Sequence, residues 1–160
     1  MKEATANFFE AIRNGDTSKV RELLADEPGL VNAVDARGSS PLILATYYNH
    51  LQITELLLEK GAAIDEKDAA GNTALMGVCF KGFVELAKLL MQKGADVNAR
   101  NAMGGTCLIF ATTFNRMDIV KLLLSHGVDV MARDARGSTA LDHATKQGLD
   151  PIVKLLEKAV

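Results

Sequence analysis

The sequence of 160 residues has few of the features that mark secreted or membrane proteins. It contains only two cysteines, too few for the disulfide framework of a small secreted domain. No apolar run approaches the roughly 18 residues of a membrane-spanning helix, and the first residues lack the apolar stretch of a secretory signal. We therefore expect a cytoplasmic protein that neither spans nor binds a membrane.

The sequence also lacks an excess of charge of either sign. It has 18 basic and 20 acidic residues, a formal net charge of −2. Such a balance gives no overall field that would attract nucleic acid or an anionic membrane. Aromatic residues make up 5% of the chain and tryptophan is absent, so the positions of the few rings are informative. The 48% of hydrophobic residues excludes a mainly disordered chain.

What the sequence does have is an internal repeat with a period of 33 residues. One column of the repeat is a glycine, at Gly38, Gly71, Gly104 and Gly137. A second is a leucine, at Leu42, Leu75, Leu108 and Leu141. Two further leucine columns are adjacent, one at Leu23, Leu56, Leu89, Leu122 and Leu155 and the other at Leu24, Leu57, Leu90, Leu123 and Leu156. We expect both adjacent columns, Leu89 included, to lie in the core.

Each repeat carries signals for two short helices. A hydroxyl residue that can cap a helix N-terminus recurs at Ser40, Thr73, Thr106 and Thr139. Residues that tolerate the left-handed conformation end this first helix, at Asn49, Gly82, Asn115 and Gly148. A second apolar stripe then stops at a glycine, at Gly61, Gly94 and Gly127. The pattern predicts helix, turn, helix and hairpin-like turn in every unit.

Three segments, Ser40-Pro41-Leu42, Leu122-Leu123-Leu124 and residues 94–99, resemble the motifs of the ankyrin repeat family. The resemblance, which extends to compact bacterial-type members, implies an all-α ankyrin repeat solenoid in which β-hairpin-like turns join helix-turn-helix units. We expect one stand-alone domain, 1–160, with five repeats at about 4–33, 34–66, 67–99, 100–132 and 133–160. The chain departs from the family in lacking the histidine of its first-helix motif, which is replaced by Ile43, Met76, Ile109 and Asp142.

No pattern of catalytic or metal-binding residues is present. The three histidines, His50, His126 and His143, show no ligand spacing, and no serine or cysteine pairs with them by pattern. Cys79 and Cys107 fall in packing columns, and no glycine-rich loop precedes a Lys-Ser or Lys-Thr pair. We therefore expect no enzyme activity, no catalytic residues, no metal and no cofactor.

In the family, the hairpin tips and first helices line a concave groove that binds partners. The positions of this chain that correspond to the groove are, apart from Thr113, aromatic or basic, which is the enrichment found at protein interfaces. They are Tyr47, Tyr48, Phe80, Lys81, Thr113, Phe114, Lys146, Arg37, Lys67, Arg100, Arg133 and Arg136. We expect a monomer whose groove, with an aromatic floor and a basic rim, binds an apolar and acidic segment of another protein.

Other interpretations stay open. The rings could fill gaps between helices, and the chain could then be a pure structural spacer or scaffold. Nucleic-acid or nucleotide binding through the same rings and basic tips is a further alternative, which the negative net charge disfavours. Asn98 resembles the ankyrin asparagine that asparaginyl hydroxylases modify, but a bond to the hairpin backbone is the favoured interpretation.

Overall fold

A computed structural model describes residues 2–160, and this part of the chain is all helical, with no β-strand. It divides into two compact units, residues 1–74 and 75–160. The helices are α1 (Lys2–Arg13), α2 (Thr17–Asp26), the 3-10 helix η1 (Pro28–Asn32), α3 (Pro41–Tyr47), α4 (Leu51–Glu59), α5 (Ala74–Lys81), α6 (Val84–Gln92), α7 (Cys107–Thr113), α8 (Met117–Ser125), α9 (Ala140–Gln147) and α10 (Asp150–Ala159). The all-α solenoid expectation is confirmed.

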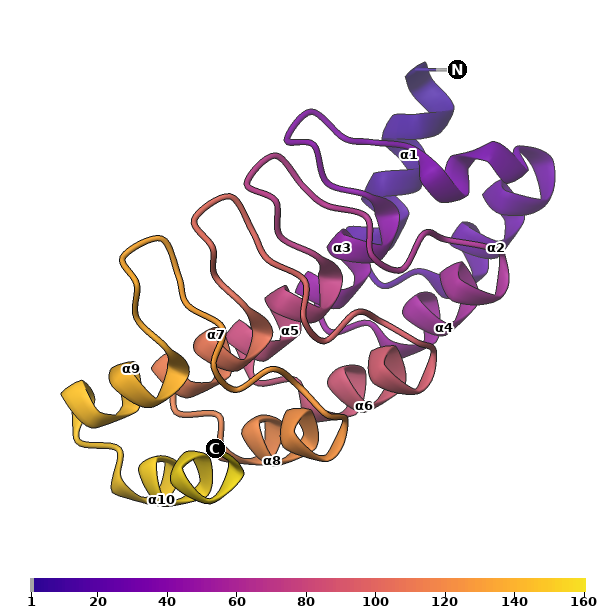
Figure 1. Cartoon of the computed structure of the whole chain (residues 1–160). Coiled ribbons are helices and arrows are strands. Elements are labelled where there is room, and N and C mark those ends of the chain that lie inside the picture. The colour runs from indigo at the N-terminus through magenta and orange to yellow at the C-terminus, as the bar shows by residue number, and fades with distance from the viewer. Residues whose placement is uncertain (1) are drawn as a thin grey trace. The chain divides into compact units, whose positions relative to one another are not determined.

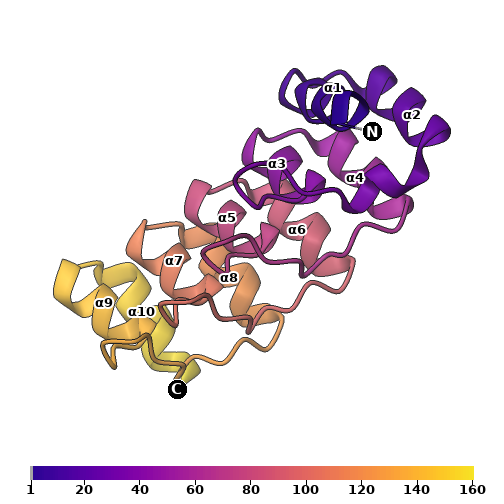
Figure 2. The same cartoon turned by 90° about the horizontal axis from the view of Figure 1, so that it is seen from above.

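The first unit consists of two layers of paired helices. The first helices of its repeats, α1 and α3, lie side by side, and the second helices, α2 and α4, form the other layer (Figure 1). The turned view in Figure 2 shows the same arrangement. Phe8, Ile12, Leu42 and Leu57, each at most 1% exposed, fill the space between the layers. The core of this unit is therefore built from the repeating apolar positions.

The second unit repeats this plan with the odd-numbered helices α5, α7 and α9 in one row and α6, α8 and α10 in the other (Figures 1 and 2). Helix α7 packs against α9, α8 packs against both α6 and α10, and α10 also packs against α9. Leu90, Leu123 and Ile152 are fully buried between the rows. Each row presents one face that the other row does not cover.

The first helices begin and end at the predicted residues. The side chain of Ser40 accepts a hydrogen bond from the Ile43 N–H at 3.2 Å, and Thr106 accepts one from the Ile109 N–H at the same distance. Asn49 and Asn115 end their helices with φ angles of 60° and 57°. These are the left-handed conformations that asparagine and glycine adopt most readily.

In every repeat after the first, one turn residue braces the loop before the first helix. Oδ1 of Asp134 accepts hydrogen bonds from the backbone N–H groups two and four residues ahead, each at 3.0 Å. The same pair of bonds is made by Asp35, Asp68 and Asn101. These side chains therefore brace the turns that precede the first helices.

Two positions differ from the sequence analysis or refine it. Leu89 is only half-buried, whereas the adjacent Leu90 is fully buried. Every member of the second leucine column is buried, but in the first column only Leu56 is. At the family's histidine position, Asp142 closes a capping box: its carboxylate accepts from the Thr139 N–H at 2.9 Å, while its own N–H donates to Thr139 Oγ1 at 3.1 Å.

Candidate partner-binding surface

Four of the chain's aromatic rings are exposed at the C-terminal ends of first helices. The exposed fractions are 53% for Tyr47, 43% for Tyr48, 40% for Phe80 and 42% for Phe114. The alternative in which these rings only fill gaps between helices would require them to be buried. Their exposure instead leaves each ring available for contact with another molecule.

The first unit contains a hollow of about 490 Å³, which we call the tyrosine hollow. Helix α3 forms one side of it through Ile43, Leu44, Tyr47 and Tyr48. The turn before α3, the end of α1 and the following loop supply Arg13, Asp35, Ala36, Arg37, Ser39 and Asp68. Of the residues expected at the groove, Tyr47, Tyr48 and Arg37 line this hollow, whereas Lys67 does not.

The charges of the tyrosine hollow nearly balance. Asp35 uses Oδ1 to accept from the backbone N–H groups of Arg37 and Ser39, both at 2.9 Å. Its Oδ2 lies 3.8 Å from Nη2 of Arg13. The Arg37 side chain is exposed and makes no hydrogen bond or ion pair within residues 2–160. The hollow therefore combines one compensated cation, one free cation and two aromatic rings.

Arg13 was missed by the sequence analysis, although a signal for it exists. The first repeat is offset by 34 residues, so that Phe8 corresponds to Leu42. The same offset places Arg13 at the position of Tyr47, which was already a candidate. Applying the offset to the whole first repeat would have added Arg13 to the candidate site.

His50 contacts two residues that line the tyrosine hollow, Tyr48 and Arg13. Its ring stacks on Tyr48 with centroids 6.2 Å apart, and its Nε2 hydrogen-bonds the carbonyl oxygen of Arg13 at 3.2 Å. Tyr48 in turn contacts Tyr47 edge to face, with centroids 5.1 Å apart. His50 thus has a structural role, because it links the end of α1 to the turn after α3.

In the second unit Phe80 and Phe114 form an exposed aromatic pair, which we call the phenylalanine pair. Their ring centroids are 4.4 Å apart at an angle of 71°. Arg116 fixes the end of α5 by donating from Nε to the carbonyl oxygen of Phe80 at 3.2 Å. The hydroxyl of Thr113, another expected site residue, is buried without a hydrogen-bond partner in the described part of the chain. It therefore presents no polar group to a ligand.

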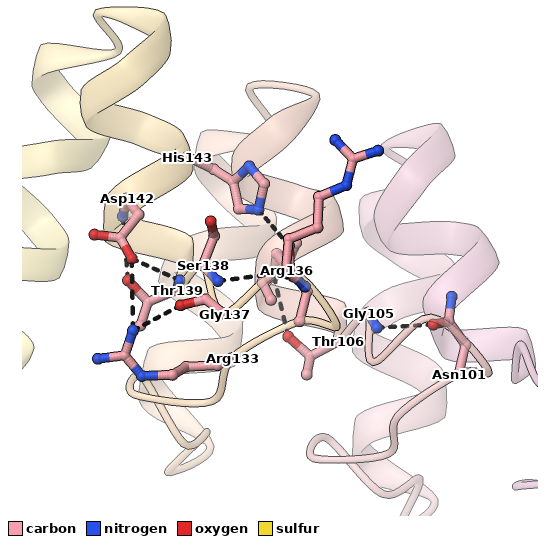
Figure 3. A network of polar contacts seen from close by, with 12 residues as sticks. Asn101, Gly105, Thr106, Arg133, Arg136, Gly137, Ser138, Thr139, Asp142 and His143 are labelled. Carbon is pink, nitrogen blue, oxygen red and sulfur yellow. Dashed lines mark hydrogen bonds and ion pairs between the residues drawn. The ribbon is translucent and has the colours of Figure 1, made fainter.

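The expected basic rim contains two kinds of residue. Arg100 donates to the carbonyl oxygen of Arg133 and so links two successive hairpins. Nη1 of Arg133 donates to the carbonyl oxygen of Gly137 at 2.7 Å, within its own hairpin (Figure 3). Arg136 and Lys146 are exposed and have no side-chain hydrogen bond or ion pair anywhere in residues 2–160. Lys81, which follows Phe80 in the sequence, is half-buried.

His143 has a partner that the sequence analysis did not identify. Its Nε2 lies 2.8 Å from Oδ2 of Asp134, nine residues earlier in the hairpin. The backbone N–H of Ser138 and then the His143 ring lower the pKa of the Asp134 carboxyl below its ordinary value. Within residues 2–160 no hydroxyl or thiol bonds the other ring nitrogen of His143, as a nucleophilic triad would need. The pair links the hairpin to α9.

The two cysteines lie in the core of the second unit. Both side chains are fully buried, and burial followed by the adjacent Cys107 thiol raises the pKa of Cys79 well above its ordinary value. A protonated thiol without access to solvent is a poor nucleophile. Across the described residues, no group of three or more His, Cys, Asp or Glu side chains is arranged to hold a metal ion. None of the helices there is both long and apolar enough to cross a membrane.

Comparison with known proteins identifies the family. The family described as "Ankyrin repeats (3 copies)" matches residues 8–101 and again residues 100–159. A search of curated proteins finds no match. The two family matches cover most of the chain and coincide with the helix pairs and braced turns described above. The chain therefore belongs to the ankyrin repeat family.

Proposed function

We propose that this chain is a non-catalytic protein-binding module that contacts its partner through the exposed rings of its first helices. The observation that carries the proposal is the exposure of Tyr47, Tyr48, Phe80 and Phe114, each at 40% or more. Monomeric proteins seldom leave several large apolar groups accessible on one kind of surface without a use. Ankyrin repeats generally act as protein–protein interaction modules, which supports this proposal.

The tyrosine hollow favours a protein partner over a nucleic acid. Asp35 and Asp68 line it together with Arg13 and Arg37, so acidic and basic groups alternate there. A nucleic-acid track needs a surface of predominantly positive charge that follows the phosphate backbone. The match over residues 8–101, which runs through residue 74, supports the further proposal that residues 1–160 act as one repeat domain.

The test is affinity capture from lysate of the cell of origin, read by mass spectrometry. The variants are Tyr47→Ala with Tyr48→Ala, and Phe80→Ala with Phe114→Ala. The matched control is Leu51→Ala with Met131→Ala, which removes two exposed apolar side chains outside the first helices. We expect one protein to be captured by the wild type and the control, and to be lost from at least one ring variant.

Equal capture by all four proteins would contradict the proposal. Light scattering on each purified protein measures its oligomeric state in parallel. A chain that captures nothing specific and stays monomeric would favour the spacer alternative, and loss of capture after nuclease treatment would favour the nucleic-acid alternative.

A further inference from the structure

The exposed first-helix face of the second unit changes character from one repeat to the next. Its aromatic part, the phenylalanine pair, lies at the ends of α5 and α7. Its basic part consists of Arg136 in the turn before α9 and Lys146 in the last turn of α9. Helix α9 packs directly against α7, so Lys146 lies on the helix next to α7 and Arg136 lies in the turn that leads into that helix.

Two carboxylates of the same repeat, Asp134 and Asp142, are already bonded within the protein. Asp134 accepts from two backbone N–H groups and from His143, and Asp142 accepts from the Thr139 N–H. Asp142 also lies 4.0 Å from Nη1 of Arg133. The remaining cations, Arg136 and Lys146, have no such partner within residues 2–160. The second unit therefore has two positive side chains without a partner in that range in addition to its exposed aromatic pair.

Arg136 is placed to reach a ligand. Its backbone N–H is held by Asp134, so the base of the side chain is fixed. Figure 3 shows the side chain extending away from the turn and past His143. Arg37, the residue at the same repeat position in the first unit, lines the tyrosine hollow. The repeat geometry thus directs this position toward the exposed side of the first helices.

We propose that the second unit binds an extended protein segment that carries a large apolar side chain and, three or four residues away, an acidic residue. This inference rests on the proposed function and specifies the partner's chemistry. Packed helices lie about 8–10 Å apart. An extended chain advances about 3.3 Å per residue, so three residues cover that distance. The apolar side chain contacts the phenylalanine pair, and the carboxylate contacts Arg136 and Lys146.

Arg100 and Arg133 are not the acidic subsite. Their guanidinium groups already donate to the carbonyl oxygens of Arg133 and Gly137. A ligand carboxylate would have to break these bonds, and the carbonyl oxygens would then lose their partners. The free cations have no such cost, and a charge-assisted bond from them to a carboxylate is stronger than one between neutral groups.

The experiment is selection of a random dodecapeptide library on the intact chain, followed by affinity measurement on the most enriched peptide. We expect enriched peptides to combine a large apolar residue with Asp or Glu three or four positions away, in either order. Phe80→Ala with Phe114→Ala is expected to weaken that peptide by about thirtyfold or more, as for central aromatic anchors. Arg136→Glu with Lys146→Glu is expected to weaken it by about tenfold or more.

A charge swap and a matched control make the test specific. A peptide with Lys in place of its acidic residue is expected to bind the Arg136→Glu, Lys146→Glu variant better than it binds the wild type. The control, Lys121→Glu with Lys154→Glu, makes the same change of charge on exposed residues of α8 and α10. It is expected to change the affinity less than twofold. Circular dichroism verifies that each variant keeps its helix content.

The outcomes separate this inference from the proposed function. Enriched peptides that need the phenylalanine pair but carry no acidic residue would overturn only the acidic subsite. Equal loss in the Lys121→Glu, Lys154→Glu control would also overturn it, because the effect would then come from net charge. No enrichment, together with capture from lysate that is independent of the rings, would overturn both. If a single-stranded oligonucleotide displaced the peptide, and if its own binding depended on salt, the proposal of a protein segment would be overturned in favour of nucleic-acid binding.

Discussion

The rings of Phe80 and Phe114 meet edge to face with centroids 4.4 Å apart, although the residues are 34 positions apart in the sequence. Phe80 lies in the last turn of α5, and Phe114 directly follows the end of α7. Both rings remain about two-fifths exposed. The contact therefore orients the rings without burying them.

The first prediction concerns this contact. In a double-mutant cycle of Phe80→Leu and Phe114→Leu, we expect a coupling energy of about 0.5–1.5 kcal/mol, the range for edge-to-face aromatic pairs. Urea unfolding followed by circular dichroism measures the four free energies of unfolding. A coupling energy indistinguishable from zero would mean that the rings do not contact each other in solution.

The second prediction compares two adjacent leucines of α6. Leu90 is fully buried, so Leu90→Ala is expected to lower the free energy of unfolding by about 2–5 kcal/mol through lost burial and a cavity. Leu89 is only half-buried, so Leu89→Ala is expected to cost less than half as much. Urea unfolding of the two variants provides the comparison. Equal costs would show that the second leucine column is not the principal core column.

The third prediction concerns acid stability through Asp134. The backbone N–H of Ser138 and the ring of His143 hold the pKa of this carboxyl below its ordinary value in the folded chain. Its contribution to stability is therefore present above the ordinary pKa of about 4 and is lost as the pH falls through the folded pKa. Asp134→Asn is expected to remove this pH-dependent contribution. The difference in free energy of unfolding between the wild type and the variant should therefore shrink as the pH falls from 5 to 2.

The sequence offers a natural control for this variant. Asn101 holds the same turn in the preceding repeat, where its Oδ1 accepts from the N–H groups of Met103 at 3.0 Å and Gly105 at 2.7 Å. An asparagine at position 134 can therefore keep the turn bonds. Asn101→Asp is expected to have the opposite effect and to increase the acid sensitivity. Thermal unfolding at closely spaced pH values measures both, and parallel pH profiles for wild type and Asp134→Asn would contradict the prediction.

The fourth prediction compares two glycines that share a left-handed backbone. Gly127 has φ +70° and open space where a Cβ would lie, so Gly127→Ala is expected to cost about 1–2 kcal/mol for the conformation alone. Gly104 has φ +72°, and a Cβ there would lie 2.9 Å from the backbone nitrogen of Ala135. That nitrogen donates to the carbonyl oxygen of Met103 at 3.0 Å, so the backbone has little freedom to move.

We therefore expect Gly104→Ala to cost about 1–3 kcal/mol more than Gly127→Ala, because the added methyl group displaces packed backbone. Urea unfolding of the two variants, with unchanged slope of the transition as the control, measures the difference. Equal costs would show that the close approach between the two hairpins does not persist in solution.

The local elements of the fold could be predicted because each depends on a few consecutive residues. Ser40 and Thr106 cap helices through their own hydroxyl groups, and Asn49 and Asn115 end helices through their own backbone conformation. The repeat period then multiplies these signals, since the same residue types recur at the same positions. Asn98 bonds hairpin backbone, as its favoured interpretation expected, but in the next repeat: its Oδ1 accepts from the Asp129 N–H at 2.8 Å and so links two successive hairpins.

The sequence by itself determined the all-helical repeat and the aromatic positions of the candidate site, since periodicity places equivalent residues on equivalent helices. Only the tertiary structure decided which charged groups are free. Arg133 and Arg136 look alike in sequence, yet the Arg133 guanidinium donates to the carbonyl oxygen of Gly137, whereas the Arg136 side chain has no partner within residues 2–160. The tertiary structure also decided the pairing of His143 with Asp134. Such pairings depend on distances between side chains that meet across a turn, and these distances leave no periodic trace in the sequence.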